Sequence, residues 1–401
     1  MPLSSFQKYK YNSICYSILA FYLFLTLPVN ANVTKQLEND TNKKYILVLN
    51  SYNKGYKWTD NEVQGIEDAF SNDQGVILHI EYMDTKVSND EHHYSTLKNL
   101  YQYKYKSFKF DAIISTDDDA LKFLRQYRSD LFPYNPSVIF CGVNNFNKNK
   151  ISGFNNVTGV TEANDFVSNI ELILKLHPKL KKLYVINDKL TTGKSLQLSF
   201  DHSISQYLDR LDVIYLHDLS MQQLKKKVSE LTNDSVVFYL SFFQDTDGQT
   251  YTPKEAIPQI SKSSSVPIYG SVDYMLGYGI VGGMLKSSYN QGQIAAKLTK
   301  KILNGTHVND VPVVLNSPNQ YMFDYKQLQR FDLSQSQLPK DFVLINEPQT
   351  FYYKYKYIIF MVLAIFITLL IYIQVLLSNI RKRVRAEKCA EKRLLALLGH
   401  E

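Results

Sequence analysis

The sequence predicts an α/β protein with two lobes built on parallel sheets, followed by one membrane-spanning helix. From residue 45 onward, short apolar runs rich in β-branched residues alternate with helical stretches, a pattern typical of parallel sheets covered on both faces. The alternation restarts after about residue 160, which indicates a second lobe. The third observation is a 20-residue apolar run at 358–377, long enough to cross a hydrocarbon core of about 30 Å.

The first set of elements begins with the run Tyr-Ile-Leu-Val-Leu-Asn at 45–50. Its nearly unbroken apolar character indicates a strand that is buried on both faces. Further strands are expected at 76–82, 112–115 and 138–141. Helices are expected at 62–70, 92–105 and 120–127. Residues 157–160 then indicate a short extended crossover to the second set.

The second set repeats the same order of elements. Helices are expected at 167–176, 193–208, 221–231 and near 253–261. Strands are expected at 183–186, 213–216, 236–240 and 267–269. No short fixed repeat is visible, which excludes a solenoid and leaves two sheets as the architecture.

The N-terminal segment has the order of a secretory signal. Lys8 and Lys10 precede an apolar run at 14–27, Pro28 ends that run, and Val29-Asn30-Ala31 offers small residues for cleavage. We therefore expect a signal peptide over 1–31, cleaved after Ala31, and a linker over 32–44. An uncleaved anchor is the alternative, because the run is only slightly too short to span a bilayer.

The second apolar run defines the expected topology. Its span, 357–378, carries tyrosines on the preceding side and the basic segment 381–385 on the following side. Aromatic rings favour the headgroup layer, and basic residues mark the cytoplasmic side. We expect a single-pass protein of the bacterial inner membrane, with a periplasmic or extracellular ectodomain and a cytoplasmic C-terminus. A buried core helix is disfavoured, because so long a stretch without charge is rare in soluble folds.

The formal net charge of +7 is concentrated at the two ends of the chain. Residues 1–31 hold two bases and no acid, and residues 381–401 hold seven bases and three acids. The long middle is nearly neutral, so a nucleic-acid partner is not expected. Three cysteines exclude a disulfide scaffold, and Cys141, the only cysteine in the middle, is expected as a buried thiol.

Candidate ligand-binding residues come from the loops that follow the expected strands, because ligands of open parallel sheets bind beyond the carboxyl ends of the strands. Short polar side chains and rings in these loops suit a small polar ligand with a planar or apolar part. The candidates are Ser51, Tyr52, Asp117, Asp118, Asn144, Asp188, Ser241, Phe242, Asp273 and Tyr274.

Several ordered motifs carry a family resemblance that covers about residues 43–350. They are Leu49-Asn50-Ser51-Tyr52, Gly55-Tyr56-Lys57-Trp58-Thr59-Asp60, Phe140-Cys141-Gly142-Val143-Asn144, Gly159-Val160-Thr161-Glu162, and Gly282-Gly283 before a helix at 291–303. The chain resembles the ABC-transporter substrate-binding-protein-like sensor domains, which are periplasmic-binding folds in receptor ectodomains. The resemblance implies three crossings between lobes and a ligand in the cleft, and it adds Trp58 and Glu162 to the candidates. It does not supply the ligand.

The resemblance also sets the expected division of the ectodomain, residues 45–350. The first lobe is expected to comprise about 45–158 and 275–315, and the second lobe about 162–270 and 320–345.

Two of these candidates have competing structural interpretations. Trp58 either stacks on a ligand or packs within its loop. Among Asp117, Asp118 and Asp119, one side chain is expected to cap the following helix at Ala120, and another to contact a ligand. A metal site is disfavoured there, because three successive side chains do not point at one centre.

Two further motifs do not indicate a cofactor. Gly193-Lys194-Ser195 lacks the upstream glycine of a phosphate loop, since position 188 is Asp, so it is expected to be an ordinary helix start. His92-His93 has no further ligand at metal spacing and is expected on a solvated face. No metal and no cofactor are expected, and no catalytic constellation is identifiable in the ectodomain.

The C-terminal segment 379–401 indicates a cytoplasmic helix. Its stripe of small and apolar residues at 386, 390, 394 and 397 suits a partner helix, so a homodimer is expected. The final His400-Glu401 resembles the start of the phosphoacceptor motif of sensor histidine kinases. That resemblance implies His400 as phosphoacceptor and Glu401 as assisting base. Gly399 stands where the family commonly has Ser, and no ATP-binding domain is present in the chain.

The leading hypothesis is therefore the receptor half of a two-component histidine kinase that binds a small molecule outside the membrane. As it stands, the chain is not expected to autophosphorylate. The alternatives are a membrane-tethered substrate-binding protein of an ABC importer and the receptor half of a nucleotide cyclase.

Overall fold

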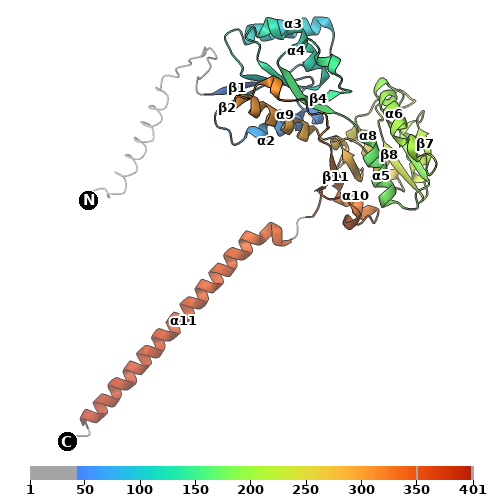
Figure 1. Ribbon diagram of the computed structural model, residues 1–401. Helices are drawn as coiled ribbons and strands as arrows, with labels where there is room; N and C mark the ends of the chain where they lie inside the picture. The colour runs from blue at the N-terminus through green and yellow to red at the C-terminus, as the bar shows by residue number, and fades with distance from the viewer. Residues whose placement is uncertain (1–42, 349–350, 399–401) are drawn as a thin grey trace, which may run out of the picture.

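The computed structural model describes residues 43–348 and 351–398. Two lobes with separate sheets lie side by side, and a long helix follows them (Figure 1). This two-lobed α/β architecture with parallel sheets confirms the predicted fold class. The expected signal peptide, its cleavage site and the candidate phosphoacceptor pair His400-Glu401 lie outside the described residues.

The first lobe is built on a parallel sheet with the order β2-β1-β3-β4-β5. Its central strands are buried along almost their whole length, which explains their continuous apolar sequence. The strands are β1 (Lys44–Asn50), β2 (Val76–Tyr82), β3 (Ala112–Thr116), β4 (Ser137–Asn144) and β5 (Val157–Glu162). The segment expected as a crossover at 157–160 is thus the fifth strand, because it pairs in parallel with β4.

The helices of the first lobe include one that comes from much later in the chain. They are α2 (Lys57–Phe70), α3 (Glu91–Lys104), α4 (Asp117–Leu131) and α9 (Ser288–Leu303), with a short helical turn η1 (Lys148–Ile151). Helix α2 begins at Lys57 rather than at the expected residue 62, since Tyr56 has an extended backbone and serves as its N-cap. Trp58 therefore lies in the first turn of α2.

Helices α2 and α9 touch through their backbones. A Cβ atom on Gly65 would lie 2.2 Å from the carbonyl oxygen of Tyr289, and one on Gly292 would lie 2.1 Å from that of Glu62. Any side chain would therefore separate the two helices. This contact fixes Glu62 of α2 and Gln291 of α9 beside the end of β4.

The second lobe is built on a sheet with the order β12-β11-β10-β9-β8-β6-β7, parallel except between β10 and β11. The strands are β6 (Lys182–Ile186), β7 (Asp212–Leu216), β8 (Ser235–Tyr239), β9 (Ile268–Tyr269), β10 (Gly282–Leu285), β11 (Gln320–Asp324) and β12 (Val343–Ile345). The helices are α5 (Phe166–Leu176), α6 (Thr191–Ile204), α7 (Met221–Ser229), α8 (Pro253–Ser263) and α10 (Tyr325–Arg330). Short turns of this lobe are η2 (Ser205–Tyr207), η3 (Asp273–Met275) and η5 (Gln335–Gln337), whereas η4 (Val308–Asp310) follows α9 and packs on β5 of the first lobe.

The chain crosses between the lobes after β5, after β10 and before β11. The middle crossing comes later than the expected residue 275. Gly282 of β10 pairs with Tyr269 on one side and Phe323 on the other, so β10 belongs to the second sheet. Three crossings place several segments near the interface of the lobes, where each can contribute side chains to a shared site.

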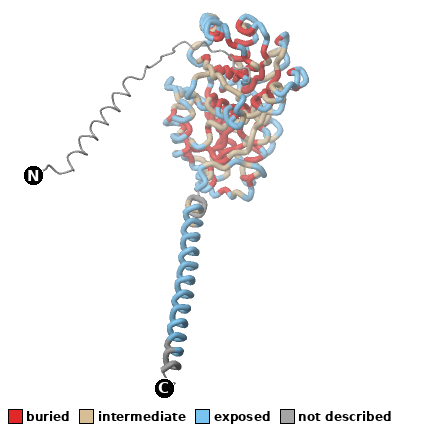
Figure 2. Tube along the Cα trace, turned by 90° about the vertical axis from the view of Figure 1, so that its left-hand side faces the viewer, coloured by how far each residue is buried: buried red, intermediate tan, exposed pale blue. Residues whose placement is uncertain are grey.

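Helix α11 (Phe351–Leu398) follows the lobes as one continuous element. Within the described residues, one helix is long and apolar enough to cross a membrane, with the candidate span at Tyr355–Ala390. Figure 2 shows this helix exposed while the lobes have buried interiors, and none of the apolar window is buried against protein. Apolar side chains without a protein partner at this length are suited to lipid.

Candidate functional site

A cavity of about 150 Å³ lies between the two lobes, and we call it the cleft cavity. The first lobe contributes residues from the carboxyl ends of its strands and from the start of α2, and the second lobe contributes residues near η3 and β10. The lining residues are Tyr52, Tyr56, Trp58, Lys86, Asp117, Asn144, Glu162, Val272, Tyr274 and Lys286. Two acids, two bases and four rings therefore line one cavity.

Asp117 is the buried acid at the end of β3. Its φ of 64° lies in the left-handed region, which is unusual for a residue with a side chain and is common at functional sites. Its Oδ1 accepts a hydrogen bond of 3.0 Å from the indole Nε1 of Trp58. Its Oδ2 has no hydrogen-bond partner within the described structure. One oxygen of this carboxyl group is thus a buried acceptor for which the described residues supply no donor.

Glu62 lies behind Asp117 and is completely buried. Burial, and then the negative charge of Asp117, raise the pKa of Glu62 well above its usual range. Neither oxygen of Glu62 meets a donor within the described structure, so a bond between the two carboxyl groups requires a proton on one of them. The pair therefore holds a proton beneath the cleft cavity.

Gly142 closes the other side of this acid pair. A Cβ atom there would lie 2.5 Å from Oε1 of Glu62 and 3.0 Å from Oδ1 of Asp117, and its φ of 68° also favours glycine. The amide of Gly142 donates to Oε1 of Gln291 on α9 at 3.2 Å. Backbone and helix thus exclude water from the side of the pair that faces away from the cavity.

A buried ion pair joins the two lobes at the cleft cavity. Lys286, just after β10, pairs with Glu162 at the end of β5, and their side chains are only 10% and 4% exposed. The Nζ atom of Lys286 also lies 5.8 Å from the centre of the Trp58 ring. Nearby, Asp273 accepts hydrogen bonds from the amide and hydroxyl of Ser288, and its burial raises its pKa to about 6.

The rings on the first-lobe side already face a cation. The Nζ atom of Lys86 lies 4.1 Å from the ring centre of Tyr52 and 5.3 Å from that of Tyr56. These two rings meet edge to face at 5.5 Å. Burial raises the pKa of Tyr52, and burial raises that of Tyr56 to about 12, so both phenols are neutral at physiological pH. Neutral rings in this arrangement suit a cation or another ring.

The structure brings together six of the residues expected from the sequence. They are Tyr52, Trp58, Asp117, Asn144, Glu162 and Tyr274. Their role in binding stays a prediction.

Two other expected residues take structural partners. The hydroxyl of Ser51 donates to the carbonyl of Thr116 and accepts from the amide of Ala120. Asp118 is not among the lining residues: it pairs with Lys150 and accepts hydrogen bonds from the backbone and side-chain amides of Asn144, which does line the cavity.

The expectation that an aspartate caps the helix at Ala120 is wrong. Helix α4 begins at Asp117 and has no side-chain cap on its N-cap residue, whereas Ser51 from the β1 loop receives the Ala120 amide. Asp119 instead accepts hydrogen bonds from Thr85 and Tyr94. The cap comes from a neighbouring strand, and a local sequence pattern does not reveal such a partner.

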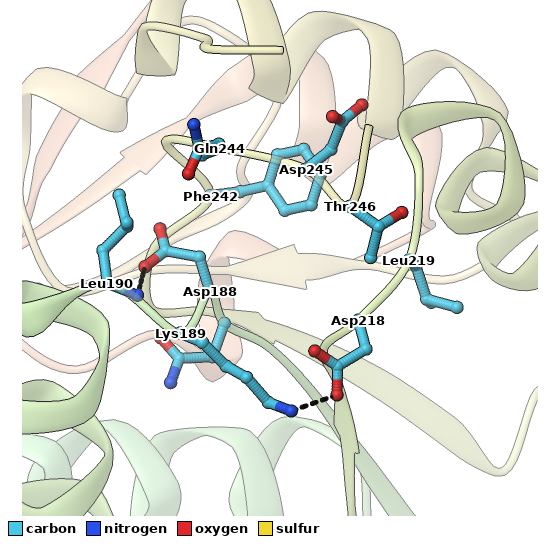
Figure 3. A pocket seen from close by; sticks show the side chains of 10 residues that line it. Asp188, Lys189, Leu190, Asp218, Leu219, Phe242, Gln244, Asp245 and Thr246 are labelled. Carbon is cyan, nitrogen blue, oxygen red and sulfur yellow. Dashed lines mark hydrogen bonds and ion pairs between the residues drawn. The ribbon is translucent and has the colours of Figure 1, made fainter. Parts of the chain in front are cut away.

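Asp188 and Phe242 line a different cavity of about 160 Å³ within the second lobe (Figure 3). There Asp188 accepts hydrogen bonds from the amides of Leu190 and Phe243, which orders the surrounding loops. Ser241 lies behind it and donates to Asn187. Asp273 is engaged by Ser288 beside the cleft cavity. These expected residues are not gathered with the others.

Five residues at or beneath the cleft cavity were not expected from the sequence: Tyr56, Glu62, Lys86, Val272 and Lys286. The sequence could have indicated Lys86, because it lies in the loop after β2, and the candidate residues were taken from the loops that follow the other strands. Glu62 gave no such signal, since an acid within an amphipathic helix is usually solvated. Cys141 is buried as expected, and no cluster of three metal-ligating side chains occurs among the described residues.

Comparisons with known proteins agree with this arrangement. A family model described as ABC transporter substrate binding protein matches residues 60–338. A tyrosine-binding protein of Clostridioides difficile (strain R20291) is 20% identical over 178 residues, which is 44% of this chain and 50% of the relative. The chain thus spans about half the length of this curated relative.

Solved structures share the fold at low sequence identity. The ligand-free, open structure of a substrate binding protein with adhesive properties from Clostridium difficile is 13% identical, with a TM-score of 0.54 over 76% of this chain and 100% of that one. An ABC domain from Streptococcus pneumoniae in complex with L-Trp is 19% identical, with a TM-score of 0.49 over the same shares. The family match gives no support to the expected histidine kinase and favours the transporter alternative.

Proposed function

We propose that this chain, which belongs to the family of ABC transporter substrate binding proteins, binds a small zwitterion with an aromatic side chain in the cleft cavity. The observation that carries the proposal is the meeting of acids, bases and rings from both lobes in one cavity. Buried acids and bases cost free energy unless an opposite charge pairs with each of them. A zwitterion carries both signs of charge and can pair with both kinds of group.

Each part of such a ligand has a matching group in the cavity. The ammonium group is expected to donate to Oδ2 of Asp117, which has no partner in the described structure. The carboxylate is expected to face Lys86. The aromatic side chain is expected to pack among Tyr52, Tyr56 and Trp58, with edge or offset contacts. The name of the tyrosine-binding relative supports this class of ligand.

The lobes are expected to close on the ligand, since each supplies part of the cavity. The Lys286–Glu162 pair already joins the two sides in the described structure, and the ligand is expected to stabilise the closed form by contacting both lobes. An importer would recognise this closed form, and helix α11 would keep it at the outer face of the membrane. Membership of this family favours a role in solute import.

A receptor is a second candidate, and one observation favours it. Helix α11 runs without a break from the end of the ectodomain through the candidate span into the basic segment after residue 380. A continuous helix can carry a displacement across a bilayer, as a sensor requires. As a receptor, the chain would signal to a histidine kinase or a nucleotide cyclase. In the kinase case, His400 would be the phosphoacceptor.

The binding proposal is tested with the full chain in lipid nanodiscs. Trp58 is the single tryptophan and lines the cavity, so its fluorescence reports occupancy directly. L-Tyrosine and L-phenylalanine are expected to change this signal, with L-leucine weaker and glucose without effect. Asp117→Asn should weaken binding about tenfold to a hundredfold, because it removes the charge that pairs with the ammonium group.

The matched control is Asp130→Asn, which removes an exposed charge from the far end of the same helix, where Asp130 pairs with Lys98. Equal affinity of Asp117→Asn and the unchanged chain, or no response to any amino acid, would contradict the proposal. Crosslinking through Cys389 between chains in membranes separates the two roles, since complete failure to crosslink argues against a dimeric receptor.

A further inference from the structure

A second cavity adjoins the cleft cavity, and we call it the aromatic cavity. Its volume is about 420 Å³, and it too lies between the lobes. The start of α2 forms one wall, and the loop after β8 with the start of α8 forms the other. The lining residues are Gly55, Tyr56, Lys57, Trp58, Phe243, Tyr251, Thr252, Pro253, Lys254, Tyr274 and Tyr278.

The two cavities share three rings, those of Tyr56, Trp58 and Tyr274. Cavities that hold small ligands are commonly about 300–1,000 Å³, and the cleft cavity falls below that range while the aromatic cavity falls within it. A ligand with its ammonium group at Asp117 therefore finds most of its remaining space beyond the shared rings.

The second-lobe wall of the aromatic cavity is fixed before any ligand arrives. The segment 243–251 folds back on itself, with the amide of Tyr251 donating to the carbonyl of Phe243 at 2.9 Å. Asp245 accepts from the amides of Asp247 and Gln249 and from the hydroxyl of Tyr251. Rings on a loop held in this way need little ordering on binding.

The charge of the aromatic cavity differs from that of the cleft cavity. None of its described lining residues is acidic, whereas Lys57 and Lys254 supply positive charge from opposite lobes. The cleft cavity has the acids that suit an ammonium group, and the aromatic cavity has apolar rings bordered by bases. Together they form a path from an end that has both acids and bases to an end bordered by bases alone.

We propose that the aromatic cavity is a second ligand subsite, which takes an apolar side chain and the terminal carboxylate of a ligand longer than one amino acid. This inference rests on the proposed function, since it places the ammonium group of the same ligand at Asp117. A dipeptide with an aromatic first residue and an apolar second residue has the required order of groups. Its first side chain lies among the rings around Trp58, and its second contacts Phe243 and Tyr278.

The test compares four probes on the full chain in nanodiscs by titration calorimetry. They are L-tyrosine, Tyr-Gly, Tyr-Phe and Tyr-Phe amide. Tyr-Phe should bind about tenfold more tightly than L-tyrosine, because its second ring gains an aromatic contact. Tyr-Gly lacks that ring and Tyr-Phe amide lacks the carboxylate, so each should lose most of this advantage.

Variants at Phe243 separate the two subsites, because this residue lines the aromatic cavity and not the cleft cavity. Phe243→Ala should weaken Tyr-Phe about tenfold and change L-tyrosine by less than about twofold. Phe243→Trp, which fills the space, should also disfavour Tyr-Phe relative to L-tyrosine. Tyr103→Ala, at an exposed ring on α3, is the control for loss of an aromatic residue.

The outcomes distinguish this inference from the proposed function. Tyr-Phe binding no more tightly than L-tyrosine, or a Phe243→Ala variant that weakens both probes equally, overturns the second subsite alone. Binding of none of the four probes overturns the proposed function and the second subsite with it.

Discussion

The indole nitrogen of Trp58 donates a 3.0 Å hydrogen bond to the carboxylate of Asp117, and both residues are buried at the junction of the lobes. The bond joins the first turn of α2 to the residue that follows β3 and begins α4. The Trp58 ring lines the cleft cavity and packs with buried side chains of the second lobe, and its stacking on a ligand stays a prediction. Disruption of this hydrogen bond is the first prediction.

Trp58→Phe should weaken binding of the aromatic amino acid about tenfold and lower the free energy of unfolding by about 1–3 kcal/mol, because Asp117 loses its buried donor. Titration calorimetry and denaturant unfolding measure the two effects. Tyr103→Phe is the control, because its ring is 76% exposed and distant from the cavity residues. An unchanged affinity would mean that the bond does not position Asp117 for the ligand.

Glu62→Gln should stabilise the protein as the pH rises. The folded state raises the pKa of Glu62 through burial and the carboxylates of Asp117, Glu162 and Asp273. Its stabilising contribution is therefore complete below the unfolded pKa of about 4.3 and is lost as the pH rises through the folded pKa. Glutamine stays neutral, so thermal melting should favour the variant at pH 8 by about 1–3 kcal/mol and show little difference at pH 4.

Glu67→Gln is the matched control for this pH series, because it lies on the same helix and is exposed. If Glu62→Gln increased stability equally at pH 4 and pH 8, the inference that the acid pair holds a proton beneath the cleft cavity would be wrong.

Gly292→Ala should separate α2 from α9 and destabilise the first lobe by about 1–3 kcal/mol, since its Cβ atom would lie 2.1 Å from the carbonyl oxygen of Glu62. Gly75→Ala is the control, because a Cβ atom there meets no atom within 4 Å. Urea unfolding measures both variants. Equal stability of the two would show that the helices can shift apart without cost.

Lys286→Met should cost about 3–5 kcal/mol, because it leaves the carboxylate of Glu162 buried without its partner. The double variant Glu162→Gln with Lys286→Met should be markedly less destabilised than the single one. Lys300→Met breaks the pair with Asp73, whose side chains are 36% and 39% exposed, and should cost about 0–1 kcal/mol. Similar losses for Lys286→Met and Lys300→Met would contradict a buried link between the lobes.

The sequence was sufficient for the elements whose signals are local. The central strands β1 and β3 are continuous apolar runs, and α11 contains an uncharged span, so burial on both faces and length identify them. Strands β10 and β12 have only four and three residues, too few to establish a periodic pattern. Their place is set by pairing with distant strands.

The same distinction applies to the site. Tyr52 and Asp117 were predictable, because each follows a recognisable strand. Glu162 and Lys286 are 124 residues apart in the chain, and their pairing depends on the second crossing between lobes. The burial of Glu62 depends on the absence of side chains at Gly65 and Gly292, which the pattern of its own helix does not reveal.

The return of α9 to the first lobe has a consequence for biogenesis. The first lobe is completed only by a helix that follows β10, so all of β6 to β10 must be synthesised before α2 can acquire its partner. Domains usually fold in order from the N-terminus during synthesis. Here the strands of the second lobe emerge while the first lobe still lacks a wall, and the acid at Glu62 stays open to water until that wall arrives.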